Sequence, residues 1–111
     1  MDQNFYKEMV ENLNQLMEES AIQGKKIYLF GHCNATEELA NLLLEKGFSV
    51  EGILDNNEAK HGNQYRGIEI QPPLTILKEE PEETLVCIVA RAYAAMAAQL
   101  KRIGYKGMVR K

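Results

Sequence analysis

The chain has 111 residues, of which 45% are apolar and 26% charged, so it matches one ordinary globular domain and excludes two-domain, disordered, collagen-like and disulfide-dense architectures. Its formal net charge of −3 gives no general electrostatic reason to expect binding to nucleic acid or to an anionic membrane. The charge is nevertheless uneven: residues 1–24 carry −4, residues 25–90 carry −5, and residues 91–111 carry +6 with no acidic residue.

The first 24 residues predict an amphipathic helix. Apolar side chains from Phe5 to Ile22 recur mostly at three- and four-residue steps, which is the period of a helix with one apolar face, and Gly24 ends it. We therefore divide the chain into an N-terminal helix over residues 1–24 and an α/β domain over residues 25–111. The helix either packs on the flank of this domain or forms a dimer contact with a second copy.

Apolar runs and helical patterns alternate along the rest of the chain. Predicted strands cover residues 26–30, 48–54, 68–70, 85–90 and 107–110, and predicted helices cover residues 34–46, 92–103 and a short segment between Pro72 and Pro81. Parallel strands need such crossovers, and the crossovers are right-handed. The pattern therefore predicts an α/β fold: a doubly wound, three-layer, Rossmann-like parallel sheet with strand order 3-2-1-4-5 along the chain.

Ligands of such sheets bind beyond the carboxyl ends of the strands, at the point where the strand order reverses. This point lies between the first strand and the 85–90 strand. The predicted rim of the site is formed by Gly31–Thr36, Asp55–Asn57 and Arg91–Tyr93.

The loop after the first strand departs from the glycine pattern of a dinucleotide-binding turn. That pattern would place glycines at positions 31, 33 and 36, where this chain has Gly31, Cys33 and Thr36. The side chain of Cys33, beside His32, stands where a phosphate would approach the backbone. We expect Asn34 to be the N-cap of the next helix, with Glu37 completing a capping box. The alternative to a phosphate site is a well-capped helix without a ligand.

Asp55 is the strongest single candidate for binding. It lies 24 residues beyond Gly31, at the end of the second strand, where an acidic side chain accepts hydrogen bonds from a ribose hydroxyl. Asn56 follows it in the same turn. The alternative is that Asp55 only satisfies backbone amides of this turn, as Asx residues often do.

Arg91 and Tyr93 follow the most apolar predicted strand and face the same crevice. The guanidinium of Arg91 could supply a phosphate contact that the loop has lost, or it could be a solvated charge or pair with Glu37 or Glu38. Tyr93 offers a flat surface to a base or sugar.

Catalytic and metal-binding patterns are not found. Cys33 at a helix start could be an activated thiol, but no arginine follows at the spacing of the cysteine phosphatases and Cys87 lies in a predicted buried strand. The spacing of His32, Cys33 and His61 matches no zinc module. We expect no catalytic residue and no metal, so an enzymatic activity of this domain alone is not predicted.

The chain start has no basic segment followed by an apolar one, and no run approaches about 18 apolar residues. With two cysteines in unlike settings, we expect a cytoplasmic protein with reduced thiols that does not insert into membranes. We also expect no nucleic-acid partner and a further domain after the C-terminus.

Several segments are similar to a known group of modules. They are Lys26–Gly31, Val50–Asn57, Lys60–Gly62 and Tyr65–Ile70, and they resemble the small Rossmann-like nucleotide-binding modules of bacterial envelope and polysaccharide enzymes. Such modules accompany nucleotide-sugar epimerases and dehydratases, sugar acyltransferases, and CDP-glycerol glycerophosphotransferases of teichoic-acid type. The resemblance implies that Gly31 forms the turn and that Asp55 and Asn56 lie near the ribose or base of a UDP-type ligand.

The sequence therefore supports two hypotheses. The first is a non-catalytic module of a larger transferase that binds a nucleotide or nucleotide-sugar through Gly31, His32, Cys33, Asn34, Asp55, Asn56, Arg91 and Tyr93, with NAD as a further possible ligand. The second is a degenerate Rossmann-like domain for docking or dimerisation that binds no nucleotide.

Overall fold

The computed structural model describes residues 7–8, 10–11, 14–15 and 24–110. The six described residues among the first 23 are helical, as predicted. The other residues before Gly24 for which a helix is predicted, and the dimer contact expected for it, lie outside the described residues.

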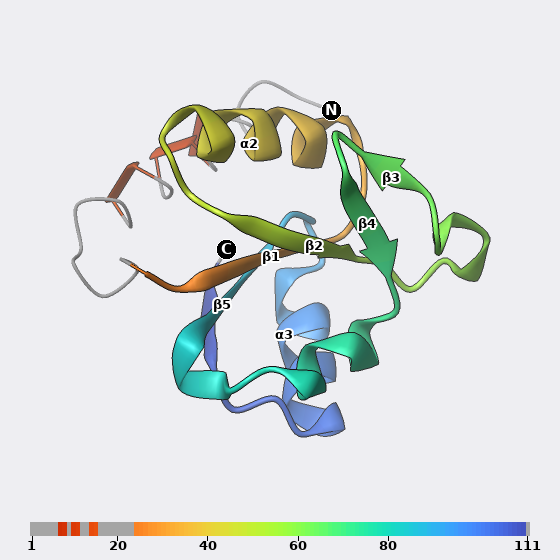
Figure 1. Ribbon diagram of the computed structural model, residues 1–111. Helices are drawn as coiled ribbons and strands as arrows, with labels where there is room; N and C mark the ends of the chain where they lie inside the picture. Colours follow the sequence, from red (N-terminus) through yellow and green to blue (C-terminus); the bar gives the residue numbers. More distant parts are fainter. Residues whose placement is uncertain (1–6, 9, 12–13, 16–23, 111) are drawn as a thin grey trace.

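The described part of the chain forms one α/β unit (Figure 1). Its strands are β1 (Lys26–Phe30), β2 (Val50–Leu54), β3 (Gln64–Tyr65), β4 (Ile68–Gln71), β5 (Thr84–Ile88) and β6 (Met108–Arg110). Its α-helices after residue 24 are α2 (Asn34–Glu45) and α3 (Tyr93–Ile103). Its 3-10 helices are η2 (Glu58–Lys60), η3 (Pro73–Lys78) and η4 (Pro81–Glu83).

The sheet has the order β3-β4-β2-β1-β5-β6 among the described residues. Five of these strands are mutually parallel and correspond, counted along the chain, to the predicted order 3-2-1-4-5, which is confirmed. Strand β3 was not predicted; it pairs antiparallel with β4 at the edge of the sheet. It lies within the polar stretch between β2 and β4. Its two residues are too few to show the alternation of apolar and polar side chains that predicts a strand.

Strand β1 separates two apolar layers by the alternation of its side chains. Ile27 and Leu29 pack with α2 on one face, and Tyr28 and Phe30 pack with α3 and η3 on the other. Figure 1 shows α2 above the sheet and α3 below it. This is the three-layer arrangement that the sequence predicts.

The register of the central strands brings three strand ends together. Phe30 pairs with Leu54 of β2 and with Ile88 of β5. The residues that follow, Gly31 and Asp55, therefore emerge side by side at the carboxyl edge of the sheet, next to the loop after β5. The 85–90 strand ends earlier than predicted, at Ile88.

Candidate functional site

A cavity of about 370 Å³ lies at this carboxyl edge. It is lined by Gly31, His32, Cys33, Asp55, Val89, Ala90 and Arg91. Five of the eight predicted site residues thus surround one space, at the predicted switch point. Its ligand role remains a prediction.

Gly31 forms the turn at the base of the cavity and no other residue fits its backbone without strain. Its φ is +103°, and a Cβ added there would lie 3.0 Å from the carbonyl oxygen of Val89. Its N–H donates to the carbonyl of Leu54 at 2.8 Å. The turn is therefore packed between β2 and the loop after β5, with a backbone approach that only glycine permits.

The start of α2 differs from the prediction. The N-cap is Cys33, not Asn34, and the capping box is completed by Thr36, not Glu37. Thr36 is buried and its hydroxyl both donates to the Gly31 carbonyl and accepts from the Cys33 N–H at 3.2 Å. Thr36 contacts both the turn and the N-cap. Helix α2 therefore begins at Asn34, one residue earlier than it would with Asn34 as the N-cap.

The Asp55 carboxylate is bonded twice to the backbone. Its Oδ2 accepts from the N–H of His32 at 2.8 Å, and its Oδ1 accepts from the N–H of Asn57 at 2.7 Å. The backbone N–H of Asp55 donates to Gln71 at 2.9 Å, and its carbonyl lies 2.7 Å from Nε2 of His61. Asp55 therefore joins the two loops that border the cavity.

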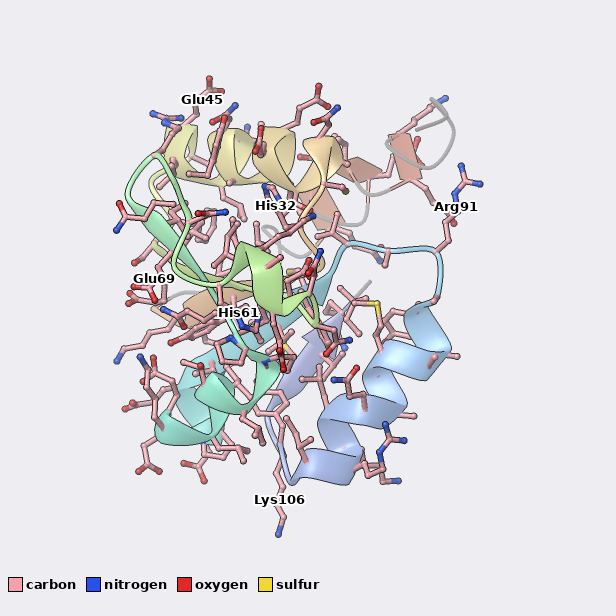
Figure 2. The ribbon with its side chains drawn as sticks, turned by 90° about the vertical axis from the view of Figure 1, so that its right-hand side faces the viewer. His32, Glu45, His61, Glu69, Arg91 and Lys106 are labelled. Atoms are coloured by element: carbon pink, nitrogen blue, oxygen red, sulfur yellow. The ribbon has the colours of Figure 1, made fainter. Side chains whose placement is uncertain are left out.

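His32 is held from several sides. Its Nε2 lies 3.0 Å from the carboxylate of Glu37, and its backbone carbonyl accepts from Nζ of Lys60 at 3.1 Å. Its Nδ1 is buried and has no hydrogen-bond partner within the described structure. Figure 2 shows Arg91 on the loop between β5 and α3, with its side chain extending outward from the ribbon.

Three predicted residues do not line the cavity. Asn34 is exposed at the first position of α2. Asn56 turns away and exchanges two hydrogen bonds with Gln99 of α3, at 3.0 and 2.7 Å. Tyr93 packs against the apolar layer below the sheet.

Four residues near the cavity were not predicted from the sequence. Val89 and Ala90 were assigned to a strand but form the wall of the cavity, because β5 ends before them. Lys60 and His61 belong to the polar segment that carries the resemblance, yet nothing in their spacing predicts their contacts with His32 and Asp55.

Cys87 confirms the prediction of a buried cysteine in a strand. Burial raises the pKa of its thiol to about 12. It therefore stays protonated at neutral pH, while Cys33 is exposed. Among the described residues, no group of three or more His, Cys, Asp or Glu side chains could hold a metal ion.

In the described part of the chain, no helix has the length and apolar character needed to cross a membrane.

Comparison with known proteins identifies a fold. No protein-family model matches the chain, and no curated protein does. The chain is similar to RSP, a Rex-family repressor, with 20% identity and a TM-score of 0.60 over 94% of this chain, and it spans 59% of the repressor chain. The complex of RSP with β-NADH gives the same identity and TM-score.

The chain is also similar to UDP-D-quinovosamine 4-dehydrogenase from Vibrio fischeri. Identity is 23% and the TM-score 0.58, over 77% of this chain and 76% of that one. Together these similarities show that the chain has a Rossmann-like fold of the kind found in nucleotide-binding domains. They support no specific family of envelope enzymes. The Rossmann-like fold that the sequence resemblance implies is therefore confirmed, and the link to envelope enzymes is not.

The expectation of no nucleic-acid partner is corrected by a further similar structure. RSP in complex with β-NAD⁺ and operator DNA matches 90% of this chain, with 22% identity and a TM-score of 0.61, and this chain spans 48% of it. A protein of this fold is thus found with DNA. The net charge of −3 was not a sufficient ground for excluding nucleic acid.

Proposed function

We propose that this chain binds a nucleotide or nucleotide-sugar in the cavity between the ends of β1, β2 and β5, and that it does so as a non-catalytic module. The observation that carries the proposal is the position of this cavity. It lies at the switch point of a doubly wound sheet, the usual ligand site of this fold, and it is lined by the tight turn of Gly31.

The volume of the cavity favours a mononucleotide part over a whole dinucleotide. At about 370 Å³, it is near the lower end of small-molecule sites, which span roughly 300 to 1,000 Å³. Gly31, Val89 and Ala90 line the cavity without polar side chains and offer walls for a base or sugar. Arg91 at the rim supplies a planar guanidinium suited to a phosphate.

The choice of ligand class has two supports. The proteins of similar fold include a repressor in complex with NADH and a UDP-sugar dehydrogenase. The sequence segments from β1 to β4 resemble modules of polysaccharide and teichoic-acid transferases, so we include UDP- and CDP-linked ligands. We also propose that the chain belongs to a larger envelope transferase, and this rests on the sequence resemblance alone.

A second candidate function is a docking domain that binds no nucleotide. It is favoured by the pairing of the loop amides. The N–H groups of His32 and Cys33 already donate to Asp55 and to Thr36, so they do not point to a phosphate as the amides of a glycine-rich loop do.

Isothermal titration calorimetry distinguishes the two candidates. The protein is titrated with UDP, CDP, a UDP-sugar, CDP-glycerol, NAD⁺ and NADH, and separately with duplex DNA at low salt, because DNA affinity falls steeply with salt. The proposal expects saturable binding of at least one nucleotide. We expect Arg91→Ala to weaken it by about tenfold, or about 1.4 kcal/mol.

The matched control is Arg102→Ala, which removes the same charge from an exposed position in the last turn of α3. It should leave nucleotide affinity unchanged. Equal losses for both variants would indicate a general charge effect and not a contact at the cavity. Absence of heat with every nucleotide would reject the proposal and leave the docking domain.

A further inference from the structure

A second cavity lies at the end of α3, on the lower face of the sheet. Its volume is about 560 Å³, larger than that of the cavity at the carboxyl edge. Its lining residues are Ala97, Lys101, Gly104, Tyr105, Lys106, Gly107 and Val109. The charged residues among them are Lys101 and Lys106, both exposed, and Figure 2 shows Lys106 extending away from the ribbon. This lysine cavity therefore fits an apolar group that has negative charges beside it.

The 3-10 helix η3 presents two leucines to solvent. Leu74 is 61% exposed and Leu77 is 45% exposed, whereas Ile76 is buried in the layer below the sheet. Residues three apart in a 3-10 helix lie on the same side of it, so the two leucines form one apolar projection. Covering them would remove apolar area from water, which is favourable. The projection is therefore suited to contact with a partner.

Acidic residues follow this projection along the chain. Glu80, Glu82 and Glu83 are exposed, and the last two belong to η4. Among the described residues, no ion pair joins these carboxylates to Lys101 or Lys106. The name leucine surface is used below for Leu74, Leu77, Glu80, Glu82 and Glu83. Its apolar and negative groups complement the lysine cavity, which carries the opposite charge.

The leucine surface and the lysine cavity adjoin on one side of the molecule. The hydroxyl of Tyr105, which lines the cavity, lies 2.8 Å from the hydroxyl of Thr84, and Thr84 donates to the carbonyl of Pro81 in η4 at 3.2 Å. Figure 1 shows the segment from η3 to η4, in shades of turquoise, below the sheet on the same side as α3. Two adjoining surfaces of this kind can pair with those of a second copy across a two-fold axis, so that each contact forms twice.

We propose that this face binds a second copy of the chain. Leu74 and Leu77 of each copy enter the lysine cavity of the other, and the acidic residues of the leucine surface pair with its two lysines. A cavity of this volume can hold a drug-sized molecule, so it has room for a leucine side chain. Complementary charges favour this arrangement over one that brings like charges together. The interface does not use the cavity at the carboxyl edge, so the inference is independent of nucleotide binding.

Sedimentation equilibrium of the full chain, from micromolar to millimolar concentration, measures this association. The mass should rise from that of one chain to that of two, and the dissociation constant should increase with salt, which screens exposed charges. Leu74→Ser combined with Leu77→Ser should weaken the association by at least about tenfold. Because both leucines are exposed, the circular dichroism spectrum of this variant should match that of wild type. Wild-type protein that stays monomeric at every concentration would overturn the inference.

Charge exchange tests the pairing itself. Lys101→Glu with Lys106→Glu should weaken the dimer by at least about tenfold, and so should Glu82→Lys with Glu83→Lys, because each pair of changes brings like charges together. The chain that carries all four changes should associate again. The control is Lys46→Glu, at an exposed lysine that ends α2 on the other face of the sheet, and it should leave the dimer unchanged.

Three results of these measurements would overturn the inference. The first is association that the leucine and charge variants leave unchanged, which would place the contact on another surface. The second is the absence of any recovery in the chain with all four charge changes. The third is assembly that grows beyond two chains, because a two-fold contact closes on itself.

Discussion

Polar side chains at the carboxyl end of the central strands and on the lower face of the sheet have different hydrogen-bond partners. At the carboxyl end, Asp55 and Thr36 bond to the backbone of the turn after β1. Along the lower face, two tyrosine hydroxyls bond to side chains of neighbouring segments. Tyr28 donates to Glu79 at 2.6 Å, and Tyr105 lies 2.8 Å from the hydroxyl of Thr84. The hydrogen bonds at the carboxyl end hold the loop that borders the cavity. Those of the lower face give buried hydroxyl groups a partner within a packed layer.

Glycine is required in both regions, the cavity and the packed lower face, for different reasons. Gly31 has a positive φ and lies against the carbonyl of Val89, so it shapes the cavity. Gly52 and Gly107 lie against the rings of Tyr28 and Tyr105, so they make room for aromatic side chains. A glycine in such a sheet is therefore not by itself a sign of a ligand site, and the two roles can be separated by substitution.

The largest effect is expected at the packed end, for Gly107→Ala. The added Cβ would meet the ring and hydroxyl of Tyr105 and lie 2.7 Å from the carbonyl of Pro81. We expect a loss of about 3 kcal/mol in the free energy of unfolding, since overpacking costs about 1 to 3 kcal/mol or more. Urea denaturation measures it. In a Tyr105→Ala background the cost should shrink; an undiminished cost would place the strain elsewhere.

Gly31→Ala tests the cavity end. Adoption of φ +103° and the approach to Val89 should together cost about 2 to 3 kcal/mol, and nucleotide binding should be lost. The matched control is Gly47→Ala, where φ is +85° and nothing lies within 4 Å of the added Cβ. It should cost only about 1 kcal/mol. Equal costs in the two variants would show that the contact with Val89 contributes nothing.

Tyr28→Phe tests the polar cluster of the lower face. The hydrogen bond from Tyr28 lowers the pKa of Glu79, so this bond stabilises the folded state at neutral pH and is lost as the pH falls through the pKa of folded Glu79. We expect the variant to be less stable by about 2 kcal/mol at neutral pH. Its stability should also depend less on pH in the acid range.

The same variant has an expected effect at high pH. Burial, and then the bond to Glu79, raises the pKa of Tyr28, so wild-type protein loses stability as the pH rises above the ordinary tyrosine value of about 10. Tyr28→Phe should reduce this loss. Tyr65→Phe is the control, because the hydroxyl of Tyr65 donates to the neutral side chain of Asn41. Identical pH profiles for the two variants would contradict the role of Glu79.

The smallest effect is expected for the exposed pair of Asn56 and Gln99. The two reciprocal bonds of 3.0 and 2.7 Å join the loop after β2 to α3. A double-mutant cycle with alanine at each position should give a coupling of about 0.5 to 1 kcal/mol. A coupling near zero would show that the loop is held by Asp55 without help from α3.

Most of the fold could be predicted from the sequence, because alternation of apolar runs and helical periods is a local pattern. The strand over residues 26–30 and the sheet order followed from it. The short helix predicted between Pro72 and Pro81 is present as a 3-10 helix over Pro73–Lys78. Strand β3 has only two residues, which is too short to show a period.

The candidate site was only partly predictable. Gly31 and Asp55 could be placed together because the ends of neighbouring parallel strands meet. The hydrogen bond from His32 to Asp55 could not be predicted, because it depends on the shape of two loops that are distant in the sequence. The N-cap at Cys33 was missed because the buried contact of Thr36 with Gly31 is a tertiary interaction.

Binding of a nucleotide in the cavity at the ends of β1, β2 and β5 can be tested residue by residue. The most direct measurement is an NMR titration of ¹⁵N-labelled protein with UDP, CDP and NADH. We expect saturable shifts of the amide signals of Gly31, Cys33 and Ala90, with little change at Tyr105 and Lys106 at the opposite end. No shift with any ligand at millimolar concentration, or shifts confined to the opposite end, would contradict it.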